Sequence, residues 1–224
     1  MRDVVTVAVT SSKGMSADAL DTLIQRLPEH EQRRATAMRL DSRRRNFVLG
    51  RTLLRAAVAS GAGVRPEAVV VEIEPSGRPV LAPPLNSFSV SIAHSGCYVV
   101  VGVANRPIGV DVEQLRHSVR FPRVAVRVCS PDELRTLDGM SEAARERAFL
   151  TVWSRKEAYG KALGRGLAFP MREVTVGPHG SRILGGAGDW QVEDLDLDPS
   201  YAAAVVAQGD GWQARLDRVD RALL

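Results

Sequence analysis

Two carboxylates near the middle of the chain are the first residues whose spacing suggests chemistry. The stretch 109–113 reads GVDVE and has the β-branched composition of a strand. Because side chains alternate along a strand, Asp111 and Glu113 should point to one side. Neighbouring carboxylates repel each other unless they are solvated or share a cation, and such hard oxygen ligands suit Mg²⁺. A solvated strand end is the alternative interpretation.

A third carboxylate and a lysine lie further along the chain, in the stretch 146–166, ERAFLTVWSRKEAYGKALGRG. Apolar residues at three- and four-residue spacing predict a helix, which should end near Gly164, since glycine readily adopts a left-handed backbone. Trp153, Glu157 and Lys161 are each four residues apart, so they share one helix face. The alternative is an ordinary surface helix whose Glu-Lys pair stabilises it by about 0.2–0.5 kcal/mol.

Lysine is rare in this chain, which favours a role for the two lysines of that helix. The chain has 30 lysine and arginine residues, but lysine occurs only at Lys13, Lys156 and Lys161. Lysine is a compact point charge suited to a phosphate oxygen, whereas arginine is a bulky planar fork. The pair at 156 and 161 therefore predicts a phosphate-binding ammonium, and chance clustering of three residues is the alternative.

The charged residues are distributed unevenly, which indicates an anionic partner. Nine arginines and three acids lie between Arg26 and Arg55, whereas six acids and no basic residue lie between Asp189 and Asp210. A basic surface attracts a phosphate-bearing small molecule, an acidic protein or a nucleic acid. The arginines within 43–55 are interpreted either as a phosphate cradle or as a solvated helix face.

Length and composition are those of a globular protein, with 224 residues of which 45% are hydrophobic and 25% charged. No apolar run approaches the ~20 residues of a membrane span, and the N-terminal stretch lacks the apolar core of a secretory signal. Cys97 and Cys129 are isolated, which predicts free thiols in a reducing compartment. We therefore expect a cytoplasmic protein with no membrane partner.

The elements that must position the reactive groups follow from periodicity and capping signals. Helices are predicted at 17–27, 28–40 and 42–60, and again after the capping residues Ser130 and Ser141. Strands are predicted at 4–10, 69–73, 87–92, 98–104, 108–113, 171–176, 190–195 and 201–207, followed by a terminal helix at 212–224. The strands at 98–104 and 108–113 should form a hairpin through 105–107. We place the seam between two halves there, at 1–105 and 106–224.

Taken together, these stretches resemble the paired signature of the 4′-phosphopantetheinyl transferase superfamily. GVDVE at 109–113 and WSRKEAYGKALGRGL at 153–167 match its G-[IV]-D-[IV]-E and W-x-x-K-E-[AS]-x-x-K-x-x-G-x-G patterns in order and spacing. SVSIAHSG at 89–96 and SGRP at 76–79 resemble two upstream elements. The length resembles the larger, two-half group that acts on peptide and polyketide synthases of secondary metabolism. One departure is Ala93, where the family usually has a serine.

The resemblance implies roles for individual residues. Asp111, Glu113 and Glu157 match the family's ligands for Mg²⁺, which Mn²⁺ can replace, and Asp111, Glu157 and Lys161 form the implied catalytic group. Glu157 or a water on the metal is the implied base, and Lys161 matches a lysine at the coenzyme A pyrophosphate. The implied contacts with coenzyme A are Arg78, His94 and Lys161, together with the arginines Arg44, Arg45 and Arg51 of the basic helix.

The same resemblance implies an α+β fold with two similar halves. Each half is a small antiparallel sheet packed on a long helix, a pseudo-twofold relates the halves, and coenzyme A lies at the seam. The implied enzyme is a monomer in which a carrier-protein serine attacks the β-phosphate of coenzyme A. The 4′-phosphopantetheine arm is transferred and 3′,5′-ADP leaves, while Mg²⁺ and Lys161 stabilise charge on the pyrophosphate oxygens.

Two other functions fit parts of the sequence. A nucleic-acid-binding protein would account for the arginines, but aromatic residues make up only 5% of the chain, so stacking platforms are not evident. A Mg²⁺-dependent phosphoesterase or nucleotide hydrolase would account for the acids and Lys161. It would use water as the nucleophile, so a carrier protein should change nothing, and no P-loop pattern is present. We therefore expect no nucleic-acid partner.

Overall fold

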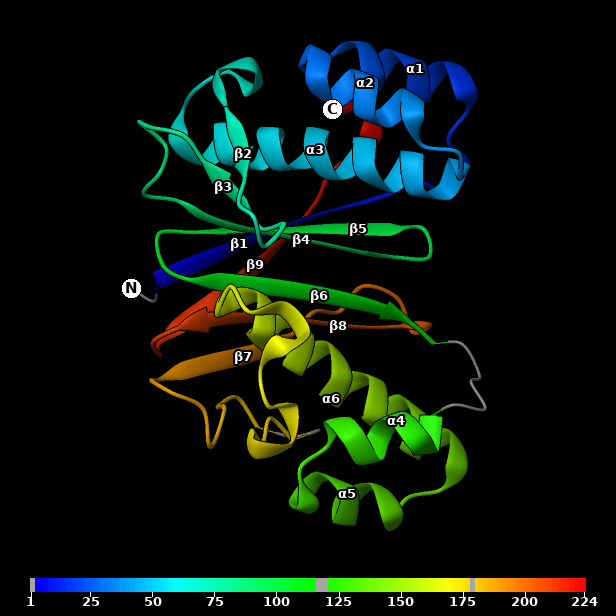
Figure 1. The fold of residues 1–224 in the computed structure, drawn as a ribbon, viewed down its shortest axis with the longest axis vertical. Coiled ribbons are helices and arrows are strands. Elements are labelled where there is room, and N and C mark those ends of the chain that lie inside the picture. The colour runs from blue at the N-terminus through cyan, green and yellow to red at the C-terminus, as the bar shows by residue number, and fades with distance from the viewer. Residues whose placement is uncertain (1–2, 116–120, 178–179) are drawn as a thin grey trace.

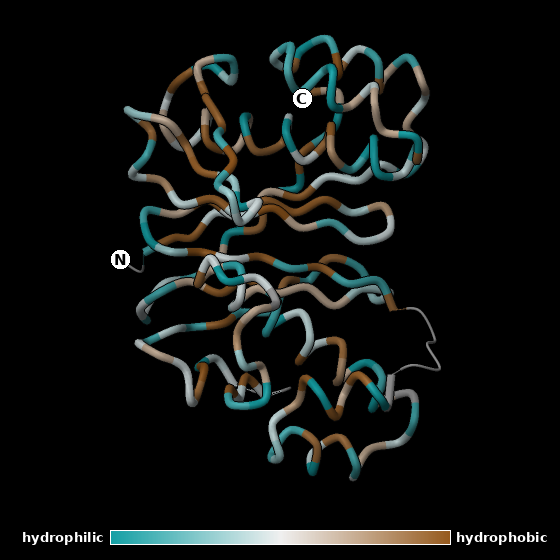
Figure 2. Tube along the Cα trace, viewed as in Figure 1, coloured by the Kyte–Doolittle hydropathy of each residue, from teal (hydrophilic) through white to brown (hydrophobic). Residues whose placement is uncertain are grey.

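The computed structural model describes residues 3–115, 121–177 and 180–224 and has the predicted α+β class. Its main elements stack in four layers, a helix, a sheet, a second sheet and a second helix (Figure 1). Hydrophobic residues are concentrated along the strands in the middle of the molecule (Figure 2). The two sheets enclose a shared core whose buried members include Val5, Val7, Val9, Val100, Val110, Val112 and Val205.

The N-terminal helices lie close to their predicted positions. They are α1 (Ala17–Gln25), α2 (Glu29–Ala37) and α3 (Asp41–Ala62). The Ser16 hydroxyl accepts a hydrogen bond from the Ala19 amide, which confirms the predicted cap of α1. The longest of them, α3, ends at Gly63, whose φ of 68° lies in the left-handed region. It covers the outer face of the first sheet.

The first sheet has the strand order β4–β5–β1–β9. Its strands are β1 (Asp3–Ser11), β4 (Ser89–Ser95), β5 (Tyr98–Ala104) and β9 (Trp212–Arg218). A separate two-stranded hairpin, β2 (Val71–Ile73) with β3 (Pro79–Leu81), carries the turn at 74–78. The turn lies near β4, because β3 is in contact with that strand.

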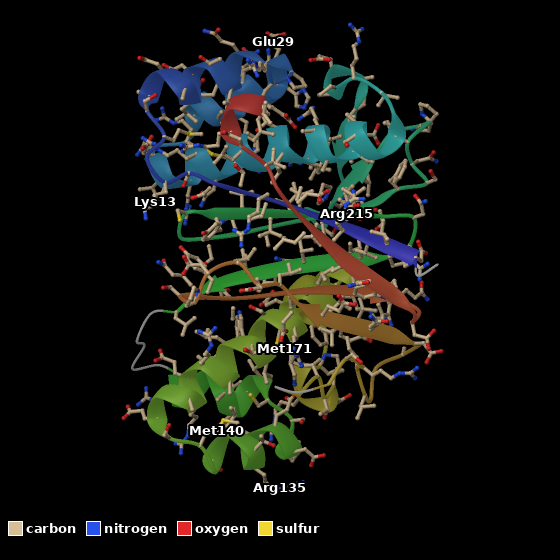
Figure 3. The ribbon with its side chains drawn as sticks, turned by 180° about the vertical axis from the view of Figure 1, so that it is seen from behind. Lys13, Glu29, Arg135, Met140, Met171 and Arg215 are labelled. Carbon is tan, nitrogen blue, oxygen red and sulfur yellow. The ribbon has the colours of Figure 1, made fainter. Side chains whose placement is uncertain are left out.

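The C-terminal strand β9 corrects the predicted terminal helix at 212–224. Apolar residues at 212, 216 and 219 have helical spacing, but the stretch runs parallel to β1 from Trp212 to Arg218. Seen from behind, this strand carries Arg215 across the first sheet (Figure 3). Only Arg221–Leu223 forms a short 3-10 helix. Pairing with the most N-terminal strand outweighs local propensity here.

The second sheet has the order β6–β8–β7, and its outer face is covered by α6. These elements are β6 (Ile108–Gln114), β7 (Trp190–Asp194), β8 (Tyr201–Gln208) and α6 (Glu142–Ala162). The predicted hairpin of 98–104 with 108–113 is wrong, because β5 pairs with β1 and β4 whereas β6 pairs with β8. The connection at 105–107 joins one sheet to the other.

Two short helices, α4 (Phe121–Val128) and α5 (Pro131–Asp138), pack against α6. The predicted start of α5 is confirmed by a reciprocal capping box between Ser130 and Glu133.

The predicted strand at 171–176 is wrong. A 3-10 helix (Met171–Glu173) and a single bridge at Thr175 replace it. Further 3-10 turns lie at Pro66–Ala68 and Gly166–Ala168. In the described part of the chain, no helix combines the length and the apolar character needed to cross a membrane.

Candidate active site

Asp111 and Lys161 form an ion pair between β6 and α6. The Lys161 ammonium donates to Asp111 Oδ1 at 2.8 Å and to the Val110 carbonyl at 3.1 Å. Asp111 is buried, and its Oδ2 has no hydrogen-bond partner among the described residues. The Ser154 hydroxyl, which lies nearby, donates to the Ala202 carbonyl instead. The face of α6 predicted from four-residue spacing therefore does meet the acidic side of β6, but its lysine binds Asp111 rather than Glu157.

Glu113 lies on the same side of β6 and is held by one donor on each oxygen. The Ser95 hydroxyl of β4 donates to Oε2 at 3.1 Å, and the Trp153 indole of α6 donates to Oε1 at 3.2 Å. Val110 and Val112, which alternate with the two acids, are buried in the core between the sheets. The predicted alternation of this strand is therefore confirmed.

Glu157 is the third carboxylate of this cluster. Burial and, to a smaller extent, the neighbouring Asp111 carboxylate raise the pKa of Glu157 to about 7, against the opposing effect of the Lys161 ammonium. Burial likewise raises the pKa of Asp111 to about 6, again against Lys161. The two pKa shifts have the same physical cause. Several carboxylates share a partly desolvated site with the Lys161 ammonium, so they resist full ionisation.

The residues of this acidic cluster (Asp111, Glu113 and Glu157) fit a divalent cation in chemical type. They supply oxygen ligands, an unpartnered buried oxygen of Asp111 and an excess of negative charge. In the described part of the chain, no three such residues are already arranged as a metal-binding group. The Lys161 ammonium lies against Asp111. Convergence of the three carboxylates on one ion stays a prediction.

A cleft of about 490 Å³ extends from Lys161 to the turn between β2 and β3. Arg78 of that turn and Arg165 beyond α6 line it with Lys161, so its charged lining is cationic. Arg78 also donates to the Ser89 hydroxyl at 3.3 Å. A Cβ at Gly164, whose φ is 68°, would lie 3.0 Å from an Arg78 Nη atom. The turn between β2 and β3 therefore packs closely on the end of α6.

A second cavity of about 370 Å³ shares Gly77, Pro79 and Ile92 with this cleft. Its polar lining comes mainly from α2 and α3, with His94 of β4 at one side. His94 is exposed, and its Nδ1 lies 3.5 Å from the Asn46 amide nitrogen. The charged residues that line this cavity are Arg34, Arg43 and Arg51, whereas burial and the Lys161 ammonium lower the pKa of His94 and favour its neutral form. The two cavities adjoin at these shared residues, and we call them together the basic groove.

Arg51 is the most constrained of these cations. It is buried against Glu31 at 3.4 Å, and Arg55 binds the same carboxylate at 2.8 Å. The guanidinium groups of Arg34 and Arg51 both lie over the Phe47 ring, 5.1 and 5.5 Å from its centroid. Arg51 Nη1 is buried without a hydrogen-bond partner among the described residues. Burial lowers the pKa of Arg51 against the opposing effect of Glu31, and the neighbouring Arg34 and Arg55 lower it further.

The other two predicted arginines have local partners. Arg44 donates to the Met38 carbonyl at 3.3 Å, and Arg45 bonds to Asp41 at 2.7 Å and to the Met15 carbonyl. Neither belongs to the residues that line the basic groove. Contacts of Arg44 and Arg45 with a ligand stay predictions, whereas Arg34 and Phe47 are groove residues that sequence reasoning missed.

Ala93, the departure from the family pattern, is buried in the core between the sheets. Its neighbours Ser91 and Ser95 lie on the same side of β4, and their hydroxyls accept hydrogen bonds from the Val110 and Gln114 amides of β6 at 3.1 Å. Sequence reasoning assigned no role to Ser95. The signal for it was the two-residue alternation that puts positions 91, 93 and 95 on one side.

Lys156 is not the phosphate ligand that its rarity suggested. It is fully buried and donates to the carbonyls of Val128, Met171 and Val174 at 2.6–2.9 Å. It also pairs with the buried Glu133 at 2.6 Å. The carbonyls at 171 and 174 point inward to this ammonium, which explains why the stretch 171–176 is not a regular strand.

Comparison with known proteins places the chain in one family. Residues 107–206 match the model of the "4′-phosphopantetheinyl transferase superfamily", and residues 15–106 match that of "4′-phosphopantetheinyl transferase, N-terminal". The 4′-phosphopantetheinyl transferase HetI of Nostoc sp. is 30% identical over 200 residues, which cover 88% of this chain and 84% of HetI. The transferase psf-1 of Bacillus pumilus is 30% identical over 183 residues, covering 78% and 76% of the two chains. The transferase Sfp of Bacillus subtilis is 25% identical over 165 residues, covering 71% and 72%.

Proposed function

We propose a specific transfer reaction on the premise that the chain belongs to the 4′-phosphopantetheinyl transferase superfamily. The chain moves the 4′-phosphopantetheine arm of coenzyme A to a serine of an apo acyl or peptidyl carrier protein. The observation that carries this proposal is the position of Lys161. Its ammonium lies both in the acidic cluster and at the end of the basic groove.

The basic groove suits an elongated anion with phosphates at two places. The cationic wall of Arg34, Arg43 and Arg51, with His94 at its side, supports binding of the 3′-phosphorylated nucleotide end of coenzyme A. Lys161 and Arg78 in the adjoining cleft support binding of the pyrophosphate. The β-phosphorus would then lie beside the acidic cluster, where the reaction needs it.

The proposed step is a displacement at that phosphorus. The serine oxygen of the carrier protein forms a bond to the β-phosphorus of coenzyme A, and the bond from this phosphorus to the bridging oxygen breaks. The electron pair of that bond stays on the departing 3′,5′-ADP. The serine proton passes to a base in the cluster, for which Glu157 is the candidate. Lys161 neutralises charge that grows on the pyrophosphate oxygens.

Asp111, Glu113 and Glu157 are the residues that would hold Mg²⁺ or Mn²⁺. Such an ion, when bound, supplies Lewis-acid stabilisation of the pyrophosphate charge. We expect that transfer stops when divalent ions are removed with a chelator and returns when excess Mg²⁺ or Mn²⁺ is added. The measurement is carrier-protein modification in chelated and replenished samples. Full activity after chelation, with metal content verified in the same sample, would contradict this prediction.

Transfer differs from hydrolysis in whether release of the nucleotide product depends on the carrier protein. We expect 3′,5′-ADP to appear, by liquid chromatography, only when an apo carrier protein is present, and in equal amount to the carrier modified. A Mg²⁺-dependent phosphoesterase or nucleotide hydrolase would release nucleotide from coenzyme A at the same rate without the carrier. That result would replace the proposed function by the hydrolase alternative.

The arginines of the second cavity should discriminate coenzyme A from dephospho-coenzyme A. A charge-assisted hydrogen bond contributes about 1.5–3 kcal/mol, so Arg43→Ala should raise the KM for coenzyme A by about tenfold. It should leave the KM for dephospho-coenzyme A nearly unchanged, and high salt should weaken the wild-type preference. Arg33→Ala is the matched control, because Arg33 is an exposed arginine of α2 paired with Glu29 outside this cavity.

A preference for coenzyme A that survives in Arg43→Ala and is insensitive to salt would give the arginines another role. Arg51→Met tests the buried arginine of the second cavity. Thermal melting is the folding control for this variant, because Arg51 also binds Glu31. Loss of the preference without loss of folding in either variant supports the assigned cavity.

The two-half organisation and the cellular setting belong to the same proposal. One long helix covers each sheet, and the two family models meet between residues 106 and 107, next to the predicted seam. These features support halves at 1–105 and 106–224 related by a pseudo-twofold, although β9 returns to the first sheet. We also propose a cytoplasmic monomer whose partners are coenzyme A and carrier proteins of secondary metabolism, without nucleic acid.

A further inference from the structure

The two oxygens of Glu113 are held from opposite sides of the seam. Ser95, at the end of β4, donates to Oε2, and Trp153, on α6, donates to Oε1. The single Ser95 hydroxyl proton goes to Glu113, while its oxygen accepts from the Gln114 amide at 3.1 Å. The hydroxyl therefore has both a donor and an acceptor role fixed by β6. Glu113 is oriented jointly by the first sheet and by α6.

The position of Ser95 is itself fixed by the turn that follows it. A Cβ at Gly96, whose φ is 56°, would lie 2.3 Å from Tyr201 Oη and 2.7 Å from Gln114 Oε1. The Cys97 amide donates to Tyr201 Oη at 3.3 Å. This turn therefore rests directly on the second sheet, and Ser95 cannot shift along β6 without breaking these contacts.

Ser91 provides an internal comparison on the same strand. It lies four residues earlier, and its hydroxyl accepts from the Val110 amide at 3.1 Å, the same distance as for Ser95 and Gln114. Among the described residues, no carboxylate is a hydrogen-bond partner of Ser91. Both serines therefore attach β4 to β6, but only Ser95 also controls a member of the acidic cluster.

We propose that Ser95 is a positioning residue whose hydroxyl fixes Glu113 in the orientation with which the acidic cluster holds a divalent cation. The inference rests on the proposed function, since that function supplies the reason for a cation at this place. Mutating a group that orients a metal ligand typically lowers metal affinity or activity by about 10–100-fold. A hydrogen bond that served only to join the two sheets would instead contribute to stability.

The test is Mn²⁺ binding to the full chain by titration calorimetry, without any assay of turnover. Ser95→Ala should bind Mn²⁺ about tenfold more weakly than wild type, and Ser95→Thr, which keeps the hydroxyl, should restore most of the affinity. Ser91→Ala is the matched control. It loses an equivalent bond to β6, so it should melt at a lower temperature but bind Mn²⁺ like wild type.

Two results from the variants would overturn the proposal. In the first, Ser95→Ala binds Mn²⁺ as tightly as wild type. In the second, Ser91→Ala and Ser95→Ala weaken Mn²⁺ binding equally, which would mean that Ser95 serves only as a contact between the sheets. Wild-type protein that binds no Mn²⁺ would overturn both this proposal and the assigned metal ligands. Carrier-protein modification is measured separately, so a wild type that binds Mn²⁺ in a Ser95-dependent way but transfers nothing contradicts the proposed function alone.

Discussion

Lys161→Met is expected to fold and to lose at least about a hundredfold in turnover, which is the typical cost of one preorganised contact with developing charge. The ammonium lies at the end of the basic groove and 2.8 Å from Asp111. Folding should survive, because Asp111, whose pKa is already raised to about 6, can take up a proton when its partner is lost. The measurement is the carrier-modification rate at saturating coenzyme A.

Two further variants separate chemistry from charge alone. Lys161→Arg should recover activity only in part, since the planar guanidinium cannot reproduce a compact ammonium between a carboxylate and a phosphate. Lys13→Met removes the same charge from an exposed lysine that does not line the basic groove, and it should behave like wild type. Near-normal turnover of Lys161→Met, with a normal melting curve, would remove Lys161 from the mechanism.

Lys156→Met is expected to show the opposite behaviour, a large loss of stability with little direct effect on chemistry. Removing one partner of a buried ion pair typically costs about 3–5 kcal/mol. Here the change removes the only cation paired with Glu133 among the described residues, although three backbone amides still donate to its carboxylate, and it leaves three inward-facing carbonyls without this donor. For a chain of this length the melting temperature should fall by about 10 °C or more. Thermal melting followed by circular dichroism measures the shift.

A second substitution checks the cause of that loss. In Lys156→Met/Glu133→Gln no buried charge is left unpaired, so part of the stability should return. The recovery should be incomplete, because the glutamine NH2 cannot accept the backbone N–H bonds that one Glu133 oxygen accepts. Turnover of Lys156→Met well below its melting temperature should stay close to wild type. A melting temperature within about 2 °C of wild type would show that the buried pair contributes little, as surface pairs do.

The acidic side of β6 and the reactive face of α6 were predictable because each depends on a local period. Alternation on a strand sets Asp111 beside Glu113, and four-residue spacing on a helix aligns Trp153 with Lys161. Both elements are long enough for their type to be read from one sequence, and the structure brings them together at the ion pair of Lys161 with Asp111. The resemblance supplied the family, which the comparisons confirm.

Pairing between distant segments was not predictable in the same way. The connection at 105–107 looks like a hairpin turn, but its strands lie in different sheets. The apolar residues from Trp212 onward have helical spacing, yet this stretch pairs with β1 as an edge strand. Lys156 and Lys161 are alike in sequence, and only the fold shows that one lies among inward carbonyls while the other faces the groove. The role of Ser95 also depends on a contact between sheets.

The most direct test of the central claim is the intact mass of an apo carrier protein incubated with this chain, coenzyme A and Mg²⁺. We predict that the carrier gains the mass of one phosphopantetheine group. A carrier whose acceptor serine is replaced by alanine should gain nothing, and Lys161→Met enzyme should modify the normal carrier far more slowly. An unchanged carrier mass while coenzyme A is consumed would contradict the account and identify a hydrolase. A gain on the carrier that lacks the serine would contradict the proposed acceptor.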